Sequence, residues 1–86
     1  MQFFIKMPEP YYKTYVYTVN LNLTFKELKD MINEKTCYGN IKYYLISGRT
    51  VINDQHDNLT IKKYNELFPT KKITDEITLN LHIRNL

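Results

Sequence analysis

The sequence has little of what secreted, membrane and metal-binding proteins need. It holds one cysteine, Cys37, which excludes an internal disulfide and a cysteine-based metal cluster within one chain. No apolar run approaches the roughly 20 residues that cross a bilayer, and the first residues do not resemble a secretory signal. Tryptophan and alanine are absent, and glycine occurs only at Gly39 and Gly48. These absences predict an intracellular protein, cytoplasmic or nuclear, with no membrane partner.

The composition that remains is that of a folded domain. Hydrophobic residues make up 43% of the 86 residues and charged residues 24%, which argues against disorder. The length allows one small core, so we expect a single domain over residues 1–86, monomeric by itself. The net charge of +3 comes from lysines spread along the chain, which is a mild bias.

Alternating apolar and polar residues predict a hairpin at the N-terminus. Met1, Phe3 and Ile5 form one apolar set, and the period resumes with Tyr15, Tyr17 and Val19. Two prolines lie between these segments and cannot donate to a strand ladder, so the strands should end near Met7 and restart near Lys13. The outer side of this hairpin should carry Gln2, Phe4, Thr14 and Val16.

The period then changes to that of an amphipathic helix. Apolar residues at helical spacing are Phe25, Leu28, Met31 and Ile32. Thr24 and Glu27 predict a capping box, in which each side chain accepts a hydrogen bond from a free backbone amide at the start of the helix. We expect fraying after Glu34 and an end at Gly39 or Asn40.

The second half predicts short strands and one short helix. Residues 41–52 indicate two strands around a turn at Gly48, and residues 53–58 a polar loop. Residues 60–67 indicate a helical turn and residues 77–83 a final alternating strand. The order of two strands, a helix, two strands, a short helix and a strand predicts an α+β fold with one helix packed across a sheet.

Several segments match one known family by residue type and order. They are residues 1–6, 24–32, 45–49, 60–65 and 78–84. Together they resemble the ubiquitin family, and the resemblance covers essentially the whole chain. It implies a β-grasp fold, a mixed sheet with one helix packed across it.

The chain departs from that family at the end used for conjugation. The family's modifiers end in a flexible Gly-Gly pair, whereas this sequence ends Arg84-Asn85-Leu86. We therefore expect a non-conjugating module that binds proteins without a covalent bond, as a small subunit or adaptor of a larger assembly. A divergent modifier that is conjugated to targets is the alternative interpretation.

The resemblance also implies where a binding surface lies. The family's apolar recognition patch corresponds to Pro8 or Glu9 in the first turn and to Leu45, Asn80 and His82 on the sheet. Of these sheet positions only Leu45 is apolar, so we expect ubiquitin receptors to bind poorly.

Four residues are our candidates for protein contacts. Phe4 and Leu45 would supply buried apolar area, Arg49 a bidentate polar contact at the rim, and His82 a pH-sensitive contact.

The sequence predicts no enzyme, no cofactor and no metal site. Cys37 with His56 lacks a recognisable third group or oxyanion motif, so we interpret Cys37 as a plain thiol. His82 lacks a second ligand at suitable spacing and is interpreted as an exposed strand residue.

A ribonucleoprotein or nucleic-acid partner is the second alternative. It depends on basic residues that could contact phosphates, namely Arg49, Lys62, Lys63, Lys71 and Lys72. No recognised nucleic-acid motif accompanies them.

Overall fold

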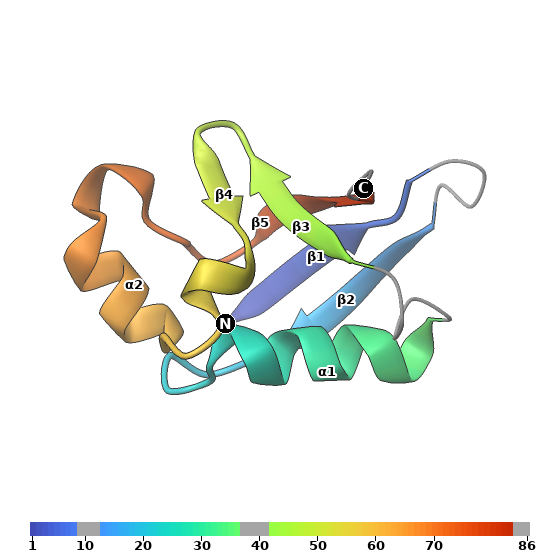
Figure 1. The fold of residues 1–86 in the computed structure, drawn as a ribbon, viewed down its shortest axis with the longest axis horizontal. Coiled ribbons are helices and arrows are strands. Elements are labelled where there is room, and N and C mark those ends of the chain that lie inside the picture. The colour runs from blue at the N-terminus through green and yellow to red at the C-terminus, as the bar shows by residue number, and fades with distance from the viewer. Residues whose placement is uncertain (9–12, 37–41, 84–86) are drawn as a thin grey trace.

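The computed structural model describes residues 1–8, 13–36 and 42–83. Within these residues a five-stranded mixed sheet combines with two α-helices in an α+β fold (Figure 1). The strands are β1 (Gln2–Lys6), β2 (Thr14–Thr18), β3 (Tyr43–Ser47), β4 (Thr50–Ile52) and β5 (Ile77–Ile83). The helices are α1 (Phe25–Lys35) and α2 (Ile61–Leu67), and short 3-10 turns lie at η1 (Asp54–His56) and η2 (Pro69–Lys71). The predicted order of strands and helices is confirmed.

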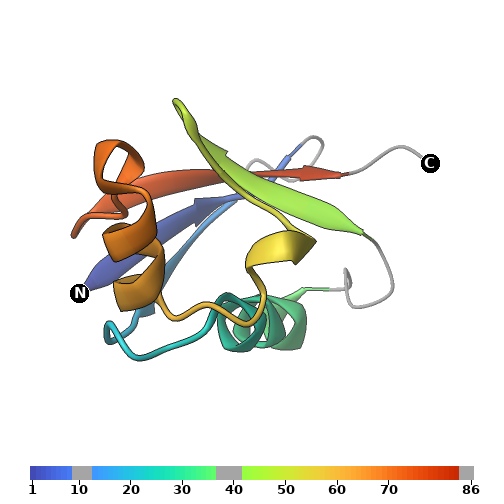
Figure 2. The same ribbon diagram turned by 60° about the vertical axis from the view of Figure 1, so that its left-hand side comes forward.

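The sheet has the strand order β2-β1-β5-β3-β4. β1 and β5 are parallel neighbours at its middle, and the other neighbouring pairs are antiparallel. Figure 2 shows α1 across one face of the sheet and α2 at one end of it. The opposite face carries no helix from the part of the chain that the structure describes.

The start of α1 follows from its capping residues. The Glu27 amide donates to Thr24 Oγ1 at 3.2 Å, and the Thr24 amide donates to Glu27 Oε1 at 3.1 Å. The predicted capping box is thus confirmed. The helix ends at Lys35 with Thr36 as its C-cap, earlier than the predicted end at Gly39 or Asn40, two residues that lie outside the described ranges.

The segment predicted as a polar loop is more regular than expected. It forms the 3-10 turn η1, whose first amides are capped by the Asn53 side chain. Lys29 Nζ of α1 lies 3.0 Å from Asp54 Oδ1 and 2.7 Å from Asp57 Oδ1. These contacts hold the turn against the helix.

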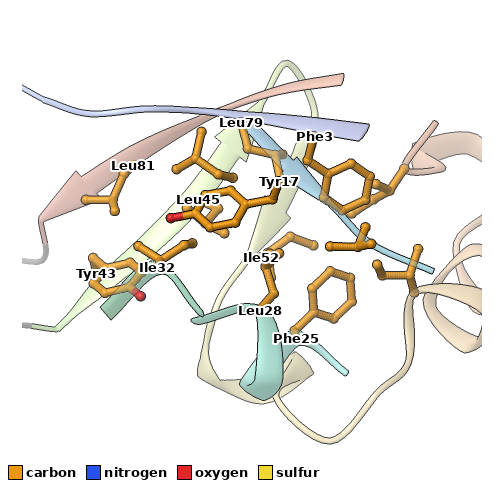
Figure 3. Packing of buried hydrophobic residues seen from close by; sticks show 14 of the residues in the cluster. Phe3, Tyr17, Phe25, Leu28, Ile32, Tyr43, Leu45, Ile52, Leu79 and Leu81 are labelled. Carbon is orange, nitrogen blue, oxygen red and sulfur yellow. The ribbon is translucent and has the colours of Figure 1, made fainter. Parts of the chain in front are cut away.

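The core lies between the sheet and α1 (Figure 3). Its fully buried members include Phe3, Ile5, Phe25, Leu28, Ile32, Leu45, Ile52, Ile61 and Leu79. The prediction that Leu45 is an exposed contact residue is therefore wrong. Leu45 pairs with Ile52 and Leu81, whose side chains are also buried, so all three point toward α1.

Two core tyrosines differ in how their hydroxyls are satisfied. The Tyr43 hydroxyl donates to Asn33 Oδ1 at 2.9 Å and lies 3.3 Å from the Lys29 carbonyl oxygen. The Tyr17 hydroxyl is buried and has no hydrogen-bond partner among the described residues. Figure 3 shows the two phenol oxygens at separate places in the core. A buried hydroxyl without a partner lowers stability, because its hydrogen bonds to water are lost without replacement.

We expect Tyr17→Phe to raise the free energy of unfolding by about 1 kcal/mol, because the ring is kept and an unsatisfied hydroxyl is removed. The matched control, Tyr43→Phe, should lower it by about 1 kcal/mol, because Asn33 then loses its donor. Urea unfolding followed by circular dichroism measures both values. Equal decreases in the free energy of unfolding of the two variants would contradict this expectation.

Candidate protein-binding face

The side chains that point away from α1 form one surface, which we call the outer face. They alternate along the strands with the buried core residues. Its apolar and aromatic members are Phe4, Val16, Tyr44, Ile46 and Val51. Its polar members are Gln2, Lys6, Thr14, Thr18, Thr78, Asn80 and His82. None of these outward-facing strand residues is acidic.

Ile46 of β3 is an apolar residue of this face that lies next to the central strand β5. It pairs with Val51 of β4 on one side and with Asn80 of β5 on the other. Asn80 Nδ2 lies 3.4 Å from the Ile46 carbonyl oxygen, to which it donates. Asn80 in turn pairs with Lys6 of β1. One row across the sheet thus runs from an apolar side to a basic one.

A second apolar pair lies on the N-terminal hairpin. Phe4 is half-buried and pairs directly with Val16, whose exposed fraction is 49%. On its other side Phe4 pairs with Thr78. The outward pair predicted from the alternation of this hairpin is therefore confirmed.

At one end of the face an aromatic stack borders a hollow. The rings of Tyr44 and His82 are nearly parallel, with centroids 5.3 Å apart and an interplanar angle of 11°. The hollow beside them has a volume of about 310 Å³ and is lined by Lys6, Met7, Pro8, Asn80, Leu81 and His82. A partner's side chain could enter there next to a cation and an aromatic stack.

The structure brings only some of the predicted contact residues together. Phe4 and His82 share the outer face, although Phe4 pairs with Thr78, so about 13 Å of β5 separates the two. Arg49 is exposed in the turn between β3 and β4, next to Gly48, whose φ of 58° favours glycine. Leu45 lies on the opposite face, in the core.

The apolar side chain that β3 presents outward beside Asn80 is that of Ile46, not that of Leu45. Leu45 was assigned from the family resemblance, and the sequence offered no check on it, because residues 43–46 are all apolar or aromatic and show no contrast of period two. The sequence of β5 shows which residues of β3 face outward. Its residues alternate as Leu79, Asn80 and Leu81, and Ile46 pairs with the polar Asn80. The outward direction of Tyr44, which lies in the same run, was missed for the same reason.

His56 occupies a partly buried polar site beside α1 and α2. Its Nδ1 accepts a hydrogen bond from the Asn53 amide at 3.2 Å. The rings of Tyr64 and Phe68 contact it edge to face, at 5.3 and 5.8 Å between centroids. Burial lowers the pKa of His56 below its ordinary 6.5, as does nearby Lys29, while Asp57 acts in the opposite direction. These contacts give His56 a structural role.

Among the described residues no cluster of histidine, cysteine, aspartate and glutamate could hold a metal ion. Cys37, considered with His56 as a nucleophile, lies outside the described ranges. Of the basic residues considered for phosphate contacts, Lys62 and Lys72 line a hollow of about 320 Å³ that also contains Glu66. Glu66 lies 3.9 Å from Lys63, so a carboxylate shares this basic region.

Comparison with known proteins adds no relative: no protein-family model matches the chain, and no curated protein matches it. In residues 1–8, 13–36 and 42–83, no helix is long and apolar enough to cross a membrane.

We expect stability to fall as the pH drops below about 6.5, because the lowered pKa of folded His56 means that the unfolded chain binds its proton first. The loss of stability should level off at pH values below the pKa of His56 in the folded protein. Urea unfolding between pH 7.5 and 5 measures it. His56→Gln should flatten this part of the curve. A His56→Gln curve as steep as that of the wild type would contradict the assignment.

Proposed function

We propose that this domain has the β-grasp fold of the ubiquitin family and binds another protein, without a covalent bond, through its outer face. The resemblance of the segments named above supports the family. The strand order and the single long helix across one face are compatible with it. The proposed role is that of a small subunit or adaptor in a larger assembly.

The observation that carries the proposal is the apolar content of the uncovered face. The core is complete without these residues, because its buried members lie between the sheet and α1. Ile46 and Phe4 nevertheless place apolar side chains on the side that no described helix covers. Apolar area flanked by polar groups is typical of a protein interface.

The charges indicate the chemistry of the partner. Lys6 lies on the outer face and Arg49 in the adjoining turn, and both are exposed. Since the outward strand residues include no acidic side chain, a partner with an apolar centre and acidic residues around it would fit best. Tyr44 and His82 would border its contact at one end.

Substitution of the outer face tests this function. We expect Ile46→Asp and Phe4→Asp, made singly, each to weaken partner binding more than tenfold, because an aspartate would be buried against an apolar surface. The matched control is Leu67→Asp, which changes an exposed leucine of α2. Leu45→Asp is unsuitable, since a charge in the core would unfold the domain.

The partner is first isolated from the native cell through an N-terminal tag, and affinities are then measured by calorimetry with variants whose circular dichroism matches the wild type. If both outer-face variants keep wild-type affinity, the proposal is wrong. Adducts that survive denaturation would instead indicate a conjugated modifier. A nucleic-acid partner whose binding collapses between low and physiological salt would support the ribonucleoprotein alternative.

A further inference from the structure

The two edges of the sheet differ in how they are protected. β4 is only three residues long, and Thr50 Oγ1 donates to the Lys71 carbonyl at 3.2 Å, which places η2 beside this edge. β2 is five residues long and contains no charge, proline or glycine. Proteins usually protect edge strands with such features, because a free edge pairs with other strands. Among the residues that the structure describes, β2 is therefore the edge open to pairing.

The register shows which backbone groups of β2 face outward. The Val19 amide donates to the Met1 carbonyl, and the Met7 amide donates to the Lys13 carbonyl, each at 2.8 Å. Hydrogen-bonded pairs alternate along an antiparallel ladder, so Tyr15 and Tyr17 also bond to β1. The amides and carbonyls of the residues between them then point away from the sheet. These residues are Thr14, Val16 and Thr18.

The sequence of β2 is the palindrome Thr-Tyr-Val-Tyr-Thr, centred on Val16. An antiparallel pairing of two copies around Val16 places Val16 opposite Val16 and Thr14 opposite Thr18. Because Val16 is one of the outward-bonding residues, this register makes every outward amide and carbonyl of β2 a hydrogen-bonding partner of the second copy. A register shifted by one residue would leave those groups unpaired.

The side chains and charges suit the same arrangement. Val16 has an exposed fraction of 49% and would contact its own symmetry mate, while threonine would contact threonine across the strands. Lys13 would lie opposite Val19, so the two Lys13 side chains would be roughly 20 Å apart, at opposite ends of the strand pair. Symmetric pairing therefore brings no like charges of this segment together.

We propose that β2 is a self-association edge, through which two copies of the chain join their sheets in an antiparallel, two-fold symmetric pair centred on Val16. From the sequence we expected a monomer, and the direction of the outward backbone groups became known only with the register. This proposal concerns the edge of the sheet and does not rest on outer-face binding. One strand pair buries less than the roughly 1,200 Å² of a stable interface, so the pair should form only at high concentration.

Sedimentation equilibrium from 10 µM to 1 mM tests the association. The mass should rise from 10.4 kDa toward twice that value. Val16→Pro should weaken association more than tenfold, because it removes an outward amide that β1 does not use. The matched control, Val16→Thr, keeps that amide and should associate within twofold of the wild type. Should Val16→Pro lose its circular dichroism spectrum, Val16→Lys replaces it, since two lysines would meet at the axis.

Oxidative cross-linking tests the symmetry, in a background with Cys37→Ser. In the proposed pair the two Cα atoms of position 16 are about 5.5 Å apart, within reach of a disulfide, whereas those of position 14 are about 14 Å apart. Val16→Cys should therefore cross-link at least tenfold faster than Thr14→Cys. A monomeric mass at 1 mM, masses beyond two copies, an unaffected proline variant or equal cross-linking rates would each overturn the proposal.

Discussion

Parallel pairing between β1 and β5 fixes the middle of the sheet, and both faces of the molecule follow from its register. The Gln2 amide donates to Asp75 Oδ1 at 2.7 Å, and the Glu76 amide donates to the Gln2 carbonyl at 2.8 Å, so the two strands meet in one alignment at their start. Phe3 and Leu79 then face the core while Phe4 and Thr78 face outward. A slip by one residue would exchange the two faces, which would bury polar side chains and expose the core.

Polar contacts hold in position the segments that connect β4 to β5, which include η1 and α2. Lys29, whose side chain is only 12% exposed, joins α1 to η1 through Asp54 and Asp57. The Asn65 side chain accepts from the Ile73 amide at 2.7 Å and donates to its carbonyl at 3.1 Å, which ties α2 to the approach to β5. Each contact satisfies groups that burial would otherwise leave without partners. These contacts lie on the helix side or at the ends of the sheet, whereas the outer face adds cross-strand contacts such as that of Asn80 with the Ile46 carbonyl and contributes no residue to the buried core.

Local patterns predicted the elements well, because their signals lie within a few residues. Alternation marked β1, β2 and β5, and Thr24 with Glu27 marked the start of α1. The candidate face was predicted less well. Residues 43–46 are uniformly apolar or aromatic, so only pairing with β5 decides that Ile46 faces outward. The ion pairs of Lys29 likewise could not be predicted from local sequence, since its carboxylate partners follow 25 and 28 residues later in the chain.

The two proposed surfaces are adjacent, because Val16 belongs to both the outer face and the β2 edge. A two-fold axis perpendicular to the sheet keeps α1 of both copies on one side and both outer faces on the other. Self-pairing through β2 would therefore create one continuous outer face, with Phe4 and Val16 of each copy near its centre. A partner that presents two binding segments could occupy both copies at once and gain affinity from their effective concentration, without any new kind of contact. Weak pairing of the edges would then be strengthened by the partner, since binding to both copies also holds the copies together.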